Sequence, residues 1–249
     1  ERTLSSIARQ VALKVVEGRK AKTTLTSRNL SKYLGPPLFT FGMAEEKDEV
    51  GTATGLVWTE AGGDVIFIEA TTMKGKGELM LTGQLGDVMR ESAQAALSYI
   101  RTHAGELGVD EDFNQKLDIH IHVPAAAIPK DGPSAGNTMA TAIASVLMDC
   151  PVRREVAMTG ESTLRGRVLP IGGLKEKVLG AHRAGITTII LPKDNEADME
   201  DIPEEVRNQL TFHCVSTLDE AFAIALLPAA NGTTPVASPT IMEELETAV

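Results

Sequence analysis

Apolar residues recur at helical spacing between Leu4 and Val15. This spacing is typical of an amphipathic helix, and Gly18, followed by two basic residues, predicts where the helix ends. The stretch 23–26 suits a short strand, and Asn29 suits the N-cap of a second helix reaching Leu34. Because Gly35 and the two prolines after it break regular structure, the pattern predicts a small, mainly helical segment that ends at about residue 38.

Two hydrophobic periods interchange along the rest of the chain. An exposed acidic linker is expected at 44–49, followed by strands at 52–59 and 65–69 that form a hairpin. Further strands are predicted at 78–82, 117–123, 155–159 and 187–191, with a second hairpin around Gly166. Helical spacing lies between them, over 85–99, up to Met148, and from Leu174. This interchange predicts an α/β (α+β) fold in which helices pack against mixed sheets.

Finer expectations concern one helix and the two ends of the chain. The predicted helix over 85–99 should carry on one face Leu85, Val88, Met89, Ser92, Ala96 and Tyr99. Residues 39–228 are expected to form the main domain, and the small, polar residues of 229–249 predict a flexible tail. The chain starts at Glu1 within a helical pattern, which suggests that it is part of a longer protein.

Composition limits the class of protein and its partners. Aromatic residues make up only 4% of the 249 residues, so the core must be mainly aliphatic and alanine. The net charge of −10 argues against nucleic acid, because nonspecific affinity comes from Lys and Arg. Cys150 and Cys214 cannot build a disulfide framework and lack metal-site spacing. No apolar run approaches the roughly 20 residues that span a bilayer. A cytoplasmic protein with no membrane contact is expected.

The first candidate for chemistry is Ser134. It lies in a loop of turn-forming residues, 129–136, that runs directly into an amphipathic helix. Unpaired backbone N–H groups at the start of that helix would suit a developing oxyanion. Ser is also a preferred N-cap residue, so a purely structural role for Ser134 remains an alternative.

The second candidate is Lys177. It shares an apolar helix stripe with Leu174, Val178 and Ala181, whereas Lys175 and Glu176 point elsewhere. The ammonium of such a lysine either extends back to water or stays buried with a lowered pKa. A buried neutral amine can take a proton from a hydroxyl group, which is the requirement of a Ser/Lys dyad.

Four motifs in this order resemble the Lon protease family: GLVWTEAGGD from Gly55, PKDGPSAG from Pro129, MTGE from Met158, and LRGRVLPIGGLKEKVLGAHRAG from Leu164. The resemblance covers about residues 52–227. It implies a serine endopeptidase whose catalytic dyad is Ser134 and Lys177. Thr159 is expected to hydrogen-bond the lysine, and Asp131 and Glu69 to line the site and take part in its rearrangement between active and inactive forms. The oxyanion and substrate loop is assigned to Gly132, Pro133, Ala135 and Trp58.

The resemblance also implies partners and a cofactor outside this chain. Residues 1–38 would be the end of the small helical domain of an AAA+ ATPase module, and 39–228 the proteolytic domain. The sequence contains no GxxxxGK[ST] phosphate loop, so ATP and Mg²⁺ are expected to belong to the missing part. Unfolded proteins or peptides are the expected substrates, and a homo-oligomer, a hexameric ring, is the expected assembly.

Three other interpretations of these residues stay open. The segment 132–136 also fits the GxSxG elbow of α/β-hydrolases, which would make the protein an esterase that uses a later His. Alternatively, the loop could hold an anion at the helix N-terminus without any catalysis. His120 and His122 share a strand face with Asp118 and could form part of a metal site, but no third ligand is close in sequence, so no metal is predicted.

Overall fold

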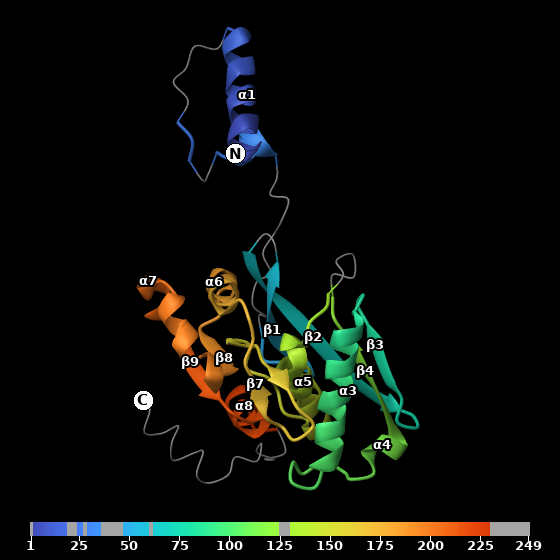
Figure 1. The fold of residues 1–249 in the computed structure, drawn as a ribbon. Helices are drawn as coiled ribbons and strands as arrows, with labels where there is room; N and C mark the ends of the chain where they lie inside the picture. Colours follow the sequence, from blue (N-terminus) through green and yellow to red (C-terminus); the bar gives the residue numbers. More distant parts are fainter. Residues whose placement is uncertain are drawn as a thin grey trace. The chain divides into compact units, whose positions relative to one another are not determined.

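The structure, a computed structural model, describes residues 2–18, 24–26, 29–35, 47–59, 62–124 and 130–229. The chain divides into two compact units, Glu1–Phe41 and Gly42–Val249 (Figure 1). Of the predicted flexible tail, only Ala229 lies within the described residues, and it is buried in the core. The domain boundaries near residues 38 and 228 stay predictions.

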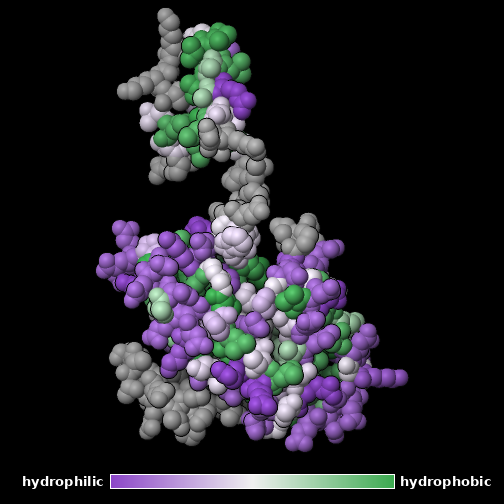
Figure 2. Space-filling view, in the orientation of Figure 1, coloured by the Kyte–Doolittle hydropathy of each residue, from purple (hydrophilic) through white to green (hydrophobic). Residues whose placement is uncertain are grey.

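The smaller unit contains α1 (Arg2–Val16) and α2 (Ser31–Leu34). Helical spacing predicted α1 correctly. Asn29 does not cap α2, because its side chain accepts from Thr26 N and donates to Thr24 O, both at 2.9 Å. These bonds close a loop, so the expected strand is absent from 24–26. Figure 2 shows hydrophobic side chains at the surface of this unit, and α1 exposes Leu4, Leu13, Val15 and Val16.

A seven-stranded mixed sheet forms the centre of the larger unit, in the order β3-β4-β2-β1-β5-β8-β9. The strands are β1 (Thr52–Thr59), β2 (Gly62–Lys74), β3 (Leu79–Thr82), β4 (Leu117–His122), β5 (Val156–Met158), β8 (Thr188–Pro192) and β9 (Thr211–Val215). β1 and β2 form the first predicted hairpin, and β1 runs parallel to β5, β8 and β9. Consequently these four strands end at the same edge of the sheet.

The second predicted hairpin is a separate two-stranded sheet of β6 (Glu161–Ser162) and β7 (Val168–Leu169). Of the expected linker at 44–49, residues 44–46 lie outside the described residues. Glu49 is not free, because it forms a β-bridge with Val152. Asp48 Oδ1 also accepts a hydrogen bond from Arg154 N at 2.9 Å. The end of this segment is therefore held to the domain.

Helices cover both faces of the sheet, which confirms the predicted α/β (α+β) architecture. α3 (Asp87–Thr102), α5 (Gly136–Met148) and α8 (Leu218–Ala225) pack on one face, and α6 (Leu174–Ala184) packs on the other (Figure 1). The shorter elements are α4 (Phe113–Lys116), α7 (Glu204–Arg207) and the 3-10 turns η1 (Pro133–Ala135), η2 (Lys193–Asn195) and η3 (Ala197–Asp201).

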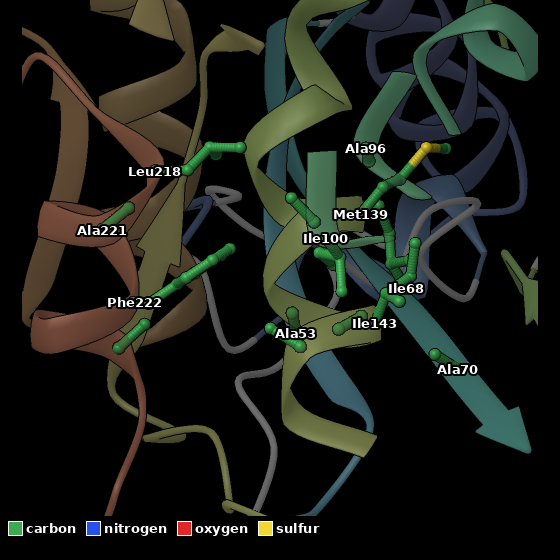
Figure 3. Close-up of a cluster of buried hydrophobic side chains, with 14 of the residues drawn as sticks. Ala53, Ile68, Ala70, Ala96, Ile100, Met139, Ile143, Leu218, Ala221 and Phe222 are labelled. Carbon is green, nitrogen blue, oxygen red and sulfur yellow. The ribbon is translucent and has the colours of Figure 1, made fainter. Parts of the chain in front are cut away.

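The larger of the two cores lies around α5. Met139 and Ile143 of this helix pack toward Ile68 on β2, while Phe222 extends from α8 toward α5 (Figure 3). Because α5 is enclosed on several sides, even its polar residues Asn137, Thr138 and Thr141 are fully buried. This enclosure fixes the helix that directly follows Ser134.

α3 turns a slightly different face to the core than the sequence predicted. Met89, Ala93, Ala96 and Ile100 are buried, whereas Val88 is 42% exposed and Ser92 bonds to its carbonyl at 3.0 Å. The buried residues follow i, i+4, i+7 and i+11, which is the stripe that packs on α5. The expected position of Val88 on the same face as Met89 was wrong.

None of the helices in the described part of the chain has the length and apolar content needed to cross a lipid bilayer. Cys150 and Cys214 are not joined in a disulfide.

Candidate active site

A cleft of about 670 Å³ lies at the edge of the sheet where β1 and β5 end. Segments far apart in the sequence form its walls: the end of β1, the loop before α5, the loop before α6, and the first turn of α6. The lining residues are 57–58, 131, 133–134, 170–173 and 176–177. Both Ser134 and Lys177 are among them, so the fold brings the two candidate residues to one cavity.

Ser134 lies in the 3-10 turn η1, immediately before α5. Its carbonyl oxygen accepts hydrogen bonds from Gly160 N at 3.0 Å and from Thr159 Oγ1 at 3.3 Å. The N-cap of α5 is Ala135, without a side-chain hydrogen bond. The Ser134 hydroxyl therefore does not cap the helix, and it makes no hydrogen bond to any other residue that the structure describes. The backbone is held while the hydroxyl stays available to a substrate.

Lys177 is buried in the first turns of α6, with only 3% of its surface exposed. The alternative that its ammonium extends to bulk water is thus excluded by the structure. Nζ donates a hydrogen bond to Thr159 Oγ1 at 3.1 Å. Because burial penalises the charged form, the pKa of Lys177 falls from its ordinary 10.5 to about 8. About a tenth of the side chain is then a neutral amine at pH 7, far more than for an ordinary lysine.

Thr159 links the lysine to the serine loop. It directly follows β5, where Met158 faces α5, so strand alternation turns Thr159 toward α6. Its hydroxyl accepts from Lys177 Nζ and donates to Ser134 O. Within the described part of the chain, no hydrogen bond joins Ser134 Oγ to Lys177 Nζ directly. Thr159 therefore sets the position of the amine relative to the serine backbone.

The position of Lys177 depends on a close approach between α6 and β2. A Cβ on Gly63 would overlap Glu176 O and lie 2.8 Å from Lys177 N, and a Cβ on Gly180 would lie 2.5 Å from the Gly63 carbonyl carbon. Only glycines permit this approach. Gly63 and Gly180 thus let α6 bring the Lys177 amine to the end of β5.

We expect Gly63→Ala to lower the free energy of unfolding by about 1–3 kcal/mol. Because α6 must move outward, Lys177 is displaced, and a shift of about 1 Å is sufficient to lower peptide hydrolysis about 100-fold. Thermal unfolding and peptidase assays measure the two effects. Gly172→Ala is the stability control, because nothing lies within 4 Å of its Cβ. Equal melting temperatures for both variants would contradict the close approach.

Asp131 holds the serine loop to the start of α3. Its Oδ1 accepts hydrogen bonds from Met89 N at 3.1 Å and from Gly132 N at 2.9 Å. Gly86, the N-cap of α3, leaves the space that the carboxylate fills, since a Cβ there would overlap it. Asp131 is therefore not simply a solvated loop residue, although its side chain is exposed. It acts as a helix cap supplied by a distant segment.

The remaining loop residues differ in their surroundings. Gly132 has φ of 133°, a conformation that strains other residues, and its N–H is occupied by the Asp131 carboxylate. That N–H is thus unavailable as an oxyanion donor in this conformation. Pro133 lines the cleft, whereas the Ala135 side chain is buried in the core. Any oxyanion donor that the backbone of this loop supplies in this arrangement must come from residues after Gly132.

Trp58 lines the cleft from the end of β1, and 59% of its surface is exposed. Sequence reasoning missed the other wall, made by residues 170–173 and by Glu176. The sequence signal for this wall was the Gly172-Gly173 pair, which directly precedes α6 and places the first turn of that helix beside the β1–β2 hairpin. Glu176, expected off the apolar stripe of α6, lines the cleft from that position.

Glu69 does not line this cleft. It pairs with Thr52 at the start of β1, whereas Trp58, at the other end, pairs with Gly63. Six residues of strand separate the two ends by about 20 Å. Glu69 instead lines a second pocket, of about 560 Å³, together with His120 and His122.

The histidines do not support the alternative enzymes. His120 Nε2 and His122 Nδ1 share the Thr82 hydroxyl, at 2.9 and 2.7 Å. The structure, over the residues it describes, contains no group of three or more His, Cys, Asp or Glu residues placed to hold a metal ion. None of the residues that line the Ser134 cleft is a histidine. Moreover, β4 ends at His122, so no strand leads straight into Ser134 as a nucleophile elbow requires.

Comparisons with known proteins agree with the motifs. The family model described as the Lon protease (S16) C-terminal proteolytic domain matches residues 24–228. A Lon protease from Brevibacillus choshinensis is 60% identical over 225 residues, which are 90% of this chain and 29% of the relative. Lon protease 1 of Bacillus subtilis (strain 168) is 60% identical over 227 residues, 91% of this chain and 29% of the relative.

A third relative, a Lon protease from Heliobacterium modesticaldum, is 53% identical over 249 residues, which are all of this chain and 31% of the relative. The chain thus spans about a third or less of the length of these relatives. The family match starts at residue 24, before the boundary predicted at residue 39.

Proposed function

The chain belongs to the Lon protease family, and on that premise we propose that it is a serine endopeptidase in which Ser134 is the nucleophile and Lys177 the base. The observation that carries the proposal is the buried amine of Lys177, with a pKa lowered to about 8, in the same cleft as the unbonded Ser134 hydroxyl. An anion-binding module would account for the serine loop but not for a desolvated lysine.

In the proposed reaction, neutral Lys177 Nζ takes the Ser134 proton as Oγ bonds to the carbonyl carbon of the substrate. Backbone N–H groups stabilise the resulting oxyanion. When the C–N bond breaks, the Lys177 ammonium donates its proton to the leaving amine. Water then attacks the acyl-enzyme, with Lys177 again taking the proton and returning it to Ser134 Oγ as the ester bond breaks.

Two supporting roles follow from the contacts of Thr159 and Asp131. Thr159 keeps Nζ oriented toward the serine loop through its shared hydroxyl. Asp131 holds the loop in an arrangement where Gly132 N is occupied. We propose that this is a resting arrangement, and that release of Asp131 from α3 frees the N–H and lets Ser134 Oγ meet Lys177 Nζ. Glu69, in its separate pocket, has no part in this mechanism.

A peptide boronate tests the nucleophile directly, because boron forms a covalent adduct with an activated serine hydroxyl. We expect a single adduct, located at Ser134 by peptide mapping, in the parent chain and in Ser98→Ala, a control at an exposed serine of α3. Ser134→Ala should form none. No adduct with the parent, or an adduct at another residue, would exclude Ser134.

The family's ATPase chemistry does not fit the residues of this chain. Gly75-Lys76-Gly77, between β2 and β3, superficially resembles a phosphate-binding turn, but Asp118 Oδ1 already accepts hydrogen bonds from Lys76 N at 2.7 Å and Glu78 N at 2.8 Å. A carboxylate where the phosphate would bind repels it. We therefore propose that ATP and Mg²⁺ act on another part of the full-length protein.

Hydrolysis of an unstructured peptide by this chain should then be insensitive to ATP and to EDTA, because the Ser/Lys reaction consumes no nucleotide and uses no metal. A stably folded substrate should resist degradation by this chain, since its free energy of unfolding is about 5–15 kcal/mol. Peptidase and degradation assays with and without each reagent measure this. Degradation of the folded substrate on addition of ATP, or loss of peptidase activity in EDTA, would contradict the proposal.

The proposal extends to the whole protein. We propose that copies of the proteolytic domain assemble into a hexameric ring in the cytoplasm, and that the ATPase module delivers unfolded protein to the enclosed sites. The length of the relatives, more than three times that of the segment matched here, supports a further module. Analytical ultracentrifugation of the full-length protein tests the assembly.

A further inference from the structure

The indole of Trp58 forms an exposed aromatic wall of the cleft. Trp58 is the penultimate residue of β1 and is 59% exposed, although large apolar side chains are usually buried. Gly173 lies against it, since a Cβ on that glycine would be 3.5 Å from Trp58 Cβ and Cγ. The ring is thus supported on one side by the start of α6 and open to the cleft on another.

Glu176 lies close to this wall. It is in the first turn of α6, three residues after Gly173, and it lines the same cleft with a half-buried side chain. Gly63, the strand partner of Trp58, packs against the Glu176 carbonyl. Gly63 and Gly173 therefore let the backbone of the first turn of α6 approach the end of β1, and the Trp58 and Glu176 side chains line the same cleft.

No ion pair between Glu176 and a cation is found among the described residues. Lys177 is adjacent in sequence but donates to Thr159 instead. Among the described residues that line the cleft, the ionisable ones are Asp131, Glu176 and Lys177. When Lys177 is neutral, as a base must be, this described lining contains two carboxylates and no cation.

We propose that Trp58 and Glu176 form a subsite for a basic side chain of the substrate, close to the bond that is cut. The proposal rests on the peptidase function and names a substrate preference of the same site. A guanidinium can stack on the indole and pair with the carboxylate at once, and its planar shape suits both contacts better than an ammonium does. Arginine should therefore be preferred over lysine, and lysine over glutamine.

Binding can be measured apart from chemistry because Trp58 is the only tryptophan of the chain. In Ser134→Ala, titration with unstructured peptides that differ only in Arg, Lys, Gln or Glu at one position should change Trp58 fluorescence. Scanning that position along the peptide locates the subsite. We expect the Arg peptide to bind about fivefold more tightly than the Gln peptide at low salt, with most of the difference lost in 0.5 M NaCl.

Hydrolysis provides the second readout, as the ratio of kcat/KM for the Arg and Gln peptides. This ratio should be about five in the parent chain, fall to near one in Glu176→Gln, and fall below one in Glu176→Arg. Trp58→Leu, which keeps apolar surface but removes the indole, should lower the ratio, while Trp58→Phe should retain part of it. Glu176→Asp, which keeps a carboxylate where Glu176→Gln has none, should still prefer the Arg peptide.

Glu106→Gln is the matched control, because it also removes one negative charge from an exposed position. It follows the end of α3, a 16-residue helix whose other end contacts Asp131, so it lies roughly 24 Å from the cleft. Its ratio should equal that of the parent. A ratio that falls equally in Glu106→Gln and Glu176→Gln would mean that the preference depends only on the net charge of the protein. That result would overturn the subsite.

The two proposals can fail separately. If hydrolysis depends on Ser134 but the Arg and Gln peptides bind and react alike, the subsite is wrong and the peptidase function stands. If Ser134→Ala cleaves as fast as the parent, or no cleavage occurs, the peptidase function fails and this substrate preference fails with it.

Discussion

Replacement of Ser134 by alanine is expected to lower kcat/KM for an unstructured peptide by on the order of 10⁴–10⁶-fold. The substitution removes the oxygen that bonds to the substrate, and the described residues that line the cleft include no histidine or second serine to replace it. The remaining rate would reflect only binding and backbone donors. An internally quenched peptide, assayed at about pH 8.5, measures the effect.

The fold should survive this substitution. Ser134 Oγ neither caps α5 nor bonds to a residue that the structure describes, so the free energy of unfolding should change by less than about 0.5 kcal/mol. Ser98→Ala should keep the parental rate, because Ser98 is exposed on α3 and bonds only within that helix. Parental activity in Ser134→Ala would exclude Ser134 as the nucleophile.

Lys177→Arg should lower the rate about 10²–10⁴-fold, the usual contribution of a general base. A guanidinium stays protonated at every workable pH and cannot accept the serine proton. In the parent, activity should follow the neutral amine of Lys177. Because burial lowers its pKa to about 8, kcat/KM should fall about tenfold per pH unit below that value and level off above it. A flat profile from pH 6 to 10, with chemistry rate-limiting, would contradict a lysine base.

Lys177→Met separates the effect of Lys177 on catalysis from its effect on the stability of the fold. The folded pKa of Lys177 lies below the unfolded one, so below about pH 8 folding must bury a charge or release a proton. The shift from 10.5 to about 8 corresponds to a cost of roughly 3 kcal/mol. This cost shrinks as pH rises from 8 to 10.5. Lys177→Met should therefore be inactive yet melt at a higher temperature than the parent at pH 6.5, and lose that advantage above pH 10. Equal melting at pH 6.5 would argue against a buried amine.

Strand and helix patterns predicted most of the main domain because its elements alternate regularly between period two and helical spacing. The β1–β2 hairpin, α5 and α6 lie close to where the pattern placed them. The predictions failed where a polar side chain formed hydrogen bonds with other partners than expected, or where a helix packed with a different face. Asn29 bonds back to Thr24 and Thr26 instead of capping α2, and the register of α3 against α5 leaves Val88 outside. Neither choice has a signature in hydrophobic spacing.

At the site, the sequence alone determined the local environment of each candidate residue, that is, whether it lies in a loop or on the buried face of a helix. Helical spacing placed Lys177 on the buried stripe of α6, and the loop of turn formers placed Ser134 next to α5. Both statements depend on neighbours within a few positions, so periodicity is enough to make them. Motif resemblance added Thr159 and Asp131, which local spacing could not connect to either residue.

Tertiary structure alone decided which of these residues meet. Gly63 lets α6 approach the hairpin so closely that Lys177 reaches Thr159, and Asp131 caps a helix that begins more than 40 positions earlier. The same topology places Glu69 at the far end of β1 and brings Glu176 into the cleft beside Trp58. These are contacts between distant segments. They follow from strand order and the direct packing of backbones, which hydrophobic periodicity does not encode because it records only which face of an element is buried.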